Sequence, residues 1–175
     1  MKRIKIQKLV LSAFFAALIC VATAVFTIPL PSAYFNLGDC FILIAAFCMG
    51  SLWGGAAAAI GAGIADLVLG FAVYAPATFV IKWLMVLVAV ALKKLLDKFK
   101  LHRFLSVAIS ALAAELCMVA GYFLFEIFLL EFKVALMDII GNSMQGAISL
   151  IAGTLCYNLL DSTGLTKKLF FRDEQ

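Results

Sequence analysis

Long apolar stretches separated by short polar links make up most of this sequence. Of its 175 residues, 66% are hydrophobic and only 14% are charged. Soluble domains are about 45–50% apolar and about 25% charged, so a chain this apolar is not expected to fold in water. A bilayer-spanning helix needs about 20 residues, whereas barrel strands alternate apolar and polar residues, which these stretches do not. The sequence predicts an all-α, polytopic membrane protein whose single integral membrane domain covers residues 1–175.

The apolar stretches predict six transmembrane helices joined by short links. Small residues recur at four-residue spacing in the third helix, which lets another helix approach it closely in lipid. The second helix is unusually short and starts at Asp39, whose negative charge suits the positive end of a helix dipole, so we expect a capping role for it. The expected helices cover about residues 9–30, 39–49, 53–69, 76–94, 104–129 and 136–160.

The basic residues are unevenly distributed over the predicted links. Twelve of the 14 lysines and arginines lie in the N-terminal segment, in the loop after the fourth helix or in the C-terminal tail. With six spans these three segments share one side of the membrane, and cytoplasmic segments carry the excess of lysine and arginine. We therefore expect a cell-membrane protein with both termini in the cytoplasm. The same topology explains the net charge of +4, which does not indicate nucleic-acid binding.

Two opposite charges interrupt the apolar pattern near the outer ends of the third and fourth helices. Asp66 lies about one turn before the end of the third helix, and Lys82 lies in the second turn of the fourth. A charge within a membrane-spanning stretch costs about 2.5–3.5 kcal/mol on insertion scales, so such residues usually face a partner or a cavity. Asp66 and Lys82 therefore indicate either the rim of a ligand pocket or an ion pair that fixes the turn between two helices.

Further polar side chains gather at the same predicted depth. Tyrosines favour membrane interfaces and amides often link helices, so each residue taken singly also has a purely structural explanation. Their shared depth on four helices, however, is typical of a small-molecule site, which is an apolar cavity with a few convergent polar groups. The predicted substrate-binding residues are Asn36, Tyr74, Lys82, Tyr122, Glu126, Asn142 and Gln145.

Sequence motifs of other functional classes are missing. There is no GxxxxGKS/T phosphate-binding loop and no HExxH metal-binding helix. The single histidine, His102, lies in a basic loop, and the five cysteines have no spacing typical of metal ligands. We therefore predict that the protein is not an enzyme and expect no catalytic residue, no metal site and no cofactor.

Several short motifs, spread over nearly the whole chain, resemble a known family. They resemble the substrate-binding S components of energy-coupling factor (ECF) vitamin transporters. The likeness is greatest to the riboflavin-type branch, which also holds proteins assigned to pyrimidine-like or pyridoxine-like vitamins. The motifs are Tyr34-Phe-Asn-Leu-Gly-Asp39, Tyr74-Ala-Pro-Ala-Thr78, Gly141-Asn142 and Gln145-Gly146.

The resemblance implies a membrane-embedded protein that captures a water-soluble vitamin from outside the cell. Such a protein works with a transmembrane coupling subunit and two ATP-binding subunits, and its ligand lies beneath the outer loops. In the family, a face of small residues on the first helix packs against the coupling subunit. That role falls here on Ala13 and Ala17, which are four residues apart and share a helix face.

Two other functions are compatible with the sequence. A stand-alone, proton-coupled carrier of small solutes would use Glu115 or Glu126 of the fifth helix. A ligand-free membrane scaffold subunit would have its pocket filled by side chains.

Overall fold

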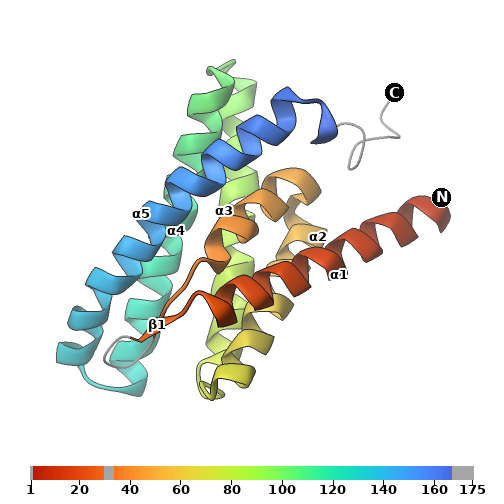
Figure 1. Cartoon of the computed structure of the whole chain (residues 1–175). Coiled ribbons are helices and arrows are strands. Elements are labelled where there is room, and N and C mark those ends of the chain that lie inside the picture. Colours follow the sequence, from red (N-terminus) through yellow and green to blue (C-terminus); the bar gives the residue numbers. More distant parts are fainter. Residues whose placement is uncertain (1, 30–33, 167–175) are drawn as a thin grey trace.

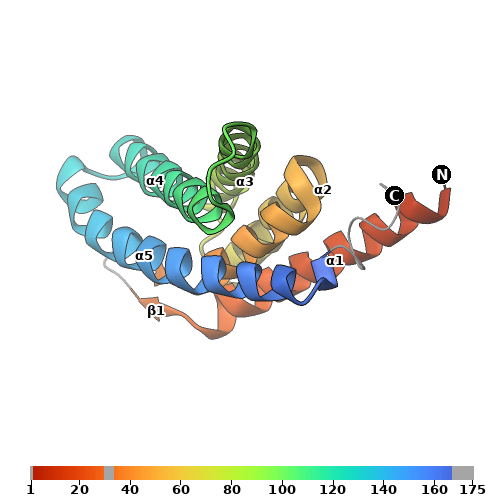
Figure 2. The same cartoon turned by 90° about the horizontal axis from the view of Figure 1, so that it is seen from above.

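The computed structural model describes residues 2–29 and 34–166 of the chain. In these ranges five helices form a bundle, and two short strands connect the first two helices (Figure 1). Helices α1 and α5 form a layer in front of α2, α3 and α4 (Figures 1 and 2). The elements are α1 (Lys2–Val25), β1 (Ile28–Pro29), β2 (Tyr34–Phe35), α2 (Gly38–Leu69), α3 (Ala75–Lys98), α4 (Arg103–Leu129) and α5 (Phe132–Ser162).

The prediction of six transmembrane helices is not confirmed. Within the described residues, five helices are long and apolar enough to cross a membrane. The expected helices 39–49 and 53–69 both belong to α2, which is interrupted at Gly50. Gly50 has φ 75° and ψ −172°, a backbone conformation that is essentially restricted to glycine. Helices α3, α4 and α5 begin and end within a few residues of their expected bounds, whereas α1 ends at Val25, before the predicted end near residue 30.

The interruption at Gly50 turns the chain back on itself. A Cβ atom on Gly54 would lie 2.7 Å from the backbone oxygen of Ala45, so the two arms of α2 pack against each other. In one straight helix these residues would be about 13 Å apart. Figure 1 shows the two arms running in opposite directions. The first arm, from Gly38 to Met49, is about 18 Å long at 1.5 Å per residue, too short for a hydrocarbon core of about 30 Å.

Helix α2 is the central element of the bundle, because it packs against α1, α3 and α5. Its glycines bring neighbouring elements unusually close. A Cβ atom on Gly61 would lie 2.5 Å from the backbone oxygen of Ala16 in α1, and one on Gly55 would lie 2.8 Å from Nε1 of Trp83 in α3. The close helix packing predicted from the small-residue repeats is therefore confirmed.

Apolar side chains cover the outside of the bundle as well as filling its interior. The interior contains fully buried residues from all five helices, whereas large apolar side chains such as Phe128, 87% exposed, lie on the outer surface. Helices that are hydrophobic on all sides are typical of membrane spans. The largest fully buried apolar side chains include Ile19, Ile42, Leu43, Met85 and Met118.

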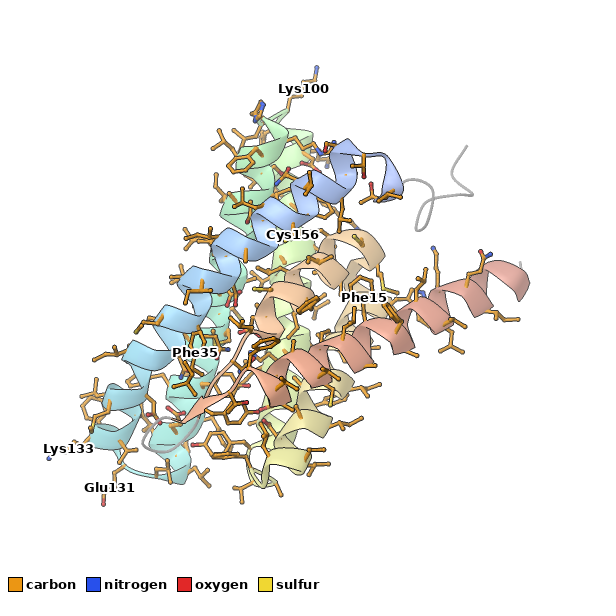
Figure 3. All side chains as sticks on the ribbon, viewed as in Figure 1. Phe15, Phe35, Lys100, Glu131, Lys133 and Cys156 are labelled. Carbon is orange, nitrogen blue, oxygen red and sulfur yellow. The ribbon has the colours of Figure 1, made fainter. Side chains whose placement is uncertain are left out.

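The connections sort to opposite ends of the bundle. Strands β1 and β2 pair antiparallel, with Ile28 opposite Phe35, and lie at the same end as the α2–α3 loop and the α4–α5 turn (Figure 1). Lys133, near the α4–α5 turn, and Lys100, in the α3–α4 loop, mark the two ends in Figure 3. The strands therefore place residues 34–36 near the end of the bundle that carries the α2–α3 loop and the α4–α5 turn.

The contact between Gly61 and α1 predicts a specific loss of stability. Gly61→Ala should lower the free energy of unfolding by about 1–3 kcal/mol, because backbone atoms of α1 cannot move aside cheaply. Gly63→Ala is the matched control, since a Cβ atom there would meet Ala75 O at an ordinary 3.7 Å. The control should be neutral or more stable by about 0.5–1 kcal/mol. Thermal unfolding of the detergent-purified variants measures both, and equal stability of the two would contradict the close α1–α2 contact.

Candidate functional site

A buried ion pair lies near the strand-bearing end of the bundle. Lys82 Nζ of α3 is 2.6 Å from Asp39 Oδ1, and the side chains are 3% and 0% exposed. Asp39 lies in the first turn of α2, where its charge suits the helix dipole as expected, but it makes no capping hydrogen bond, because the N-cap is Leu37 and no side chain caps this end. Burying two charges costs several kcal/mol per ion unless close pairing and further hydrogen bonds offset it. Asp39 therefore acts as the counter-ion of Lys82.

Helix α5 and the link between α1 and α2 complete the bonding of this pair. Gln145 Nε2 donates to Asp39 Oδ2 at 2.6 Å. Gln145 Oε1 accepts from the Asn36 backbone N–H at 2.9 Å and from Asn36 Nδ2 at 3.0 Å. Asn36 Oδ1 in turn accepts from the Gly38 N–H at 2.8 Å. These bonds join α2, α3, α5 and the link into one buried network, which we call the polar base (Asn36, Asp39, Lys82 and Gln145).

Asp66 has a different partner from the one that the sequence suggested. Lys82 pairs with Asp39 rather than with Asp66, and Asp66 Oδ1 accepts a hydrogen bond from the Tyr34 hydroxyl. Burial, reinforced by the Asp66 carboxylate, raises the pKa of the Tyr34 phenol well above its ordinary value. The phenol therefore keeps its proton and remains a donor. An Asp66–Lys82 pair does not fix the turn between α2 and α3, and Asp66 instead faces the cavity described below.

Helix α4 contributes Tyr122 to the other side of Lys82. The Tyr122 hydroxyl donates to Thr78 Oγ1 of α3 at 3.0 Å. Lys82 Nζ lies 5.2 Å from the centroid of the Tyr122 ring, which is within cation–π range. Tyr122 therefore adds to the stabilisation of a cation buried between helices.

Four aromatic rings pack together above the polar base. The ring centroids are 4.9 Å apart for Tyr34 and Phe71, 6.1 Å for Phe71 and Tyr74, and 5.3 Å for Tyr74 and Phe125. Tilted and edge-to-face arrangements at 4.5–7 Å are the favoured geometries for such rings. We call these four residues the aromatic cluster. It presents ring faces and edges to the same region as the polar groups.

A small cavity lies between the aromatic cluster and the polar base. Its volume is about 20 Å³, which is room for about one water molecule, since a cavity needs about 10–15 Å³ to hold one. In this conformation side chains thus fill most of the site, and every one of the five helices contributes to its wall. The lining residues are Thr23, Tyr34, Asn36, Ala62, Asp66, Phe71, Tyr74, Thr78, Lys82, Tyr122, Asn142 and Gln145.

Six of the seven residues predicted as substrate-binding line this cavity, and Glu126 does not. Glu126 is one helical turn, about 6 Å, further along α4 than Tyr122. It is fully buried near Asp138 of α5, and its carboxylate has no hydrogen-bond partner among the residues that the structure describes. The helical spacing placed Glu126 on the correct stripe of α4 but not at the correct depth. The six that line the cavity are Asn36, Tyr74, Lys82, Tyr122, Asn142 and Gln145.

The predicted substrate-binding residues did not include Asp39, Thr78 or Thr23. Asp39 could have been identified, because a membrane-embedded acid needs a partner and Lys82 is the one lysine that lies away from the ends of the predicted spans. Thr78 and Thr23 carried no comparable signal, since threonine is common in membrane helices and its hydroxyl can bond to its own helix backbone.

The fold and the site define a helical membrane protein that encloses a polar, aromatic-covered site near one end of its bundle. The fold is similar to that of the S component of a bacterial ECF transporter, with a TM-score of 0.75 and 19% sequence identity over 91% of this chain and 98% of that one. Comparison with curated protein sequences gives no match.

Residues 3–162 match the family described as ECF-type riboflavin transporter, S component, and the chain belongs to this family. It is therefore a substrate-binding subunit of a membrane transporter and not an enzyme. The resemblance noted in the sequence motifs is confirmed over nearly the whole chain.

The ion pair of the polar base predicts a non-additive pair of substitutions. Lys82→Met should lower the free energy of unfolding by about 3–5 kcal/mol, because it leaves the buried Asp39 carboxylate unpaired. Adding Asp39→Leu should recover much of that loss, since an apolar pair in place of a buried ion pair is often neutral. Unfolding of the single and double variants in detergent gives the coupling energy, with Lys133→Met at the exposed end of α5 as the control. Additive losses would show that the two charges do not depend on each other.

Proposed function

We propose that this protein captures riboflavin, or a vitamin with a related ring, from outside the cell. The observation that supports this most directly is the polar base beneath the aromatic cluster, built where all five helices meet. The matching family is described by riboflavin transport. A flat ring with polar groups at its edge needs aromatic surfaces for its faces and hydrogen-bonding groups for its edge, and this site offers both within one cavity.

The groups around the cavity suggest how such a ring is held. Asn142 and Gln145 of α5 provide amide donors and acceptors, and Lys82 provides a cation. Hydrogen bonds between these groups and the edge of the ring would replace some of the bonds within the polar base. The faces of Phe71 and Tyr74 would pack on the ring itself. We assign substrate binding to these five residues together with Asn36 and Tyr122.

Ligand binding in this proposal requires the site to widen. Small-molecule pockets usually measure about 300–1,000 Å³, far more than the 20 Å³ present here. The polar base is held by several short hydrogen bonds, whereas ring contacts link the members of the aromatic cluster to one another and one of them, Tyr34, also bonds to Asp66. We therefore propose that the aromatic cluster moves when the vitamin enters and that the polar base stays in place.

The orientation and partners follow from the two ends of the bundle. The site is at the end of the bundle opposite the basic α3–α4 loop. If that loop lies in the cytoplasm, as the positive-inside rule indicates, the site faces the outside of the cell and both termini lie in the cytoplasm. Ala13 and Ala17 of α1 are exposed and line an apolar groove of about 500 Å³ with Trp53 and Ile60 of α2. We propose that this groove receives the transmembrane coupling subunit, which two ATP-binding subunits drive.

Riboflavin binding to the purified chain tests the proposal. We expect saturable quenching of riboflavin fluorescence without ATP, with a Kd in the nanomolar to micromolar range. At 100 times its Kd the ligand should also add about 2.7 kcal/mol to the stability of the chain. Asn142→Ala should weaken binding by about fivefold to tenfold, the effect of losing one hydrogen bond worth about 1–1.5 kcal/mol.

The control for this experiment is on the same helix. Asn158→Ala changes the same residue type near the other end of α5, where the side chain bonds to Thr154 O at 2.8 Å. It should leave binding unchanged. Pyridoxine and hydroxymethylpyrimidine extend the screen to other ring vitamins. If no ring vitamin stabilises the chain, or if the chain alone drives uptake into liposomes under a pH gradient, the proposed function is wrong.

The proposed partner groove gives a separate prediction. Ala13→Phe together with Ala17→Phe should abolish vitamin uptake in cells and co-purification with the coupling subunit, because the bulky rings fill the groove. Vitamin binding by the isolated chain should persist, since both residues lie outside the cavity lining. Ala91→Phe, at another exposed alanine, on α3, is the control and should preserve uptake. Normal uptake by the double variant would place the coupling interface elsewhere.

A further inference from the structure

A second groove lies between α4 and α5, on the outer surface of the bundle. Its volume is about 320 Å³ and its accessible lining is entirely apolar. Phe104, Ala108 and Leu112 of α4 form one wall, and Ile151 and Leu155 of α5 form the other. None of these residues lines the cavity described above.

The groove is open on the outer surface of the bundle, the surface that the membrane is expected to surround. Its side chains are accessible from outside the bundle. Phe104, Leu112 and Ile151 are 42%, 46% and 62% exposed, respectively. The wall from Phe104 to Leu112 is about 12 Å long at 1.5 Å per residue. It runs from the first turn of α4 toward the middle of the helix. A lipid chain enters a membrane in the same direction, from the headgroup region toward the centre.

Basic residues gather at the end of α3 and in the α3–α4 loop, the end of the bundle at which this groove begins. Lys94, Lys98 and Lys100 are exposed and have no ion-pair partner among the described residues. Their neighbours Lys93 and Arg103 are paired with Asp97 and Asp161, respectively. Three lysine charges are thus left for an external anion, and Lys100 projects from this end of the bundle in Figure 3.

The start of α4 adds donors at the same place. No side chain caps this end of the helix, whose N-cap is His102. The first N–H groups of a helix attract anions, phosphate groups in particular. Phe104, at the mouth of the groove, lies two residues after this N-cap. An anionic headgroup and an apolar chain can therefore be held by adjoining parts of one surface.

We propose that the α4–α5 groove binds one acyl chain of an anionic phospholipid whose headgroup contacts the lysines of the α3–α4 loop. The apolar wall selects for a hydrocarbon chain, and the three lysines select for net negative charge. Phosphatidylglycerol satisfies both requirements, whereas phosphatidylcholine has the chain without the net charge. The bound lipid would stabilise the packing of α4 on α5 at the end of the bundle remote from the substrate site.

Native mass spectrometry of the full chain, purified in detergent and depleted of lipid, tests this site. Dioleoyl-phosphatidylglycerol should be retained as one adduct and should raise the apparent Tm, and dioleoyl-phosphatidylcholine should do neither. Ala108→Phe should remove the adduct because its ring fills the groove. Ala120→Phe, at an exposed alanine of α4 outside the groove, should keep it.

Lysine variants provide a second test, which leaves the groove itself unchanged. Lys98→Gln and Lys100→Gln should each weaken phosphatidylglycerol binding by about fivefold, which corresponds to about 1 kcal/mol per basic residue at an anionic surface. Lys133→Gln, at the other end of the bundle (Figure 3), should have no effect.

Three results would overturn the proposal. Equal retention of the two lipids would show that the lysines play no part. An unchanged adduct in Ala108→Phe would place the lipid elsewhere. Equal stabilisation by inorganic phosphate alone would reduce the site to an anion site without a lipid chain.

Discussion

The buried pair of Lys82 and Asp39 is the interaction on which the substrate end of this protein depends. A membrane interior offers no water to either charge, so each requires a partner within the protein. The pair holds the first turn of α2 against α3, and Gln145 ties α5 to the same carboxylate. Three helices are thereby fixed at one depth. The ion pair and its hydrogen bonds thus also fix the positions of the cavity walls.

The short first arm of α2 explains how irregular backbone is tolerated at this depth. Because the arm cannot span the hydrocarbon core, the link before it has to enter the bundle to reach Gly38. Backbone within a membrane needs internal hydrogen-bond partners. The N–H of Asn36 bonds to Gln145 and that of Gly38 bonds to the Asn36 side chain. The same amides that form the polar base thus also satisfy the link, which couples the fold to the site.

The sequence predicted the membrane class, the bounds of α3 to α5 and most of the cavity lining, because long apolar runs and intramembrane polar residues carry strong signals. It placed a break between residues 49 and 53, but it counted the arm before that break as a full span, since run length does not show whether a short arm crosses the bilayer. It also suggested Asp66 as a partner for Lys82, because Asp66 is nearer in sequence than Asp39. Glu126 shared a helix stripe with Tyr122, but helical periodicity defines a face and not the depth at which a cavity ends.

The two ends of the bundle differ in how firmly they are held, and that difference bears on transport. At the basic end, Lys93–Asp97 braces α3, Ser106 of α4 also bonds to Asp97, and Arg103–Asp161 links α4 to α5. Helices α3, α4 and α5 are therefore cross-linked at the basic end. At the other end the polar base joins α3 and α5 to α2, and α4 is linked to α3 by the bond from Tyr122 to Thr78. The proposed widening of the site would therefore involve the aromatic residues of the link and of the α2–α3 loop, which pack by ring contacts apart from the hydrogen bond of Tyr34 to Asp66. In the proposed function, recognition would then belong to the polar base and access to the aromatic cluster.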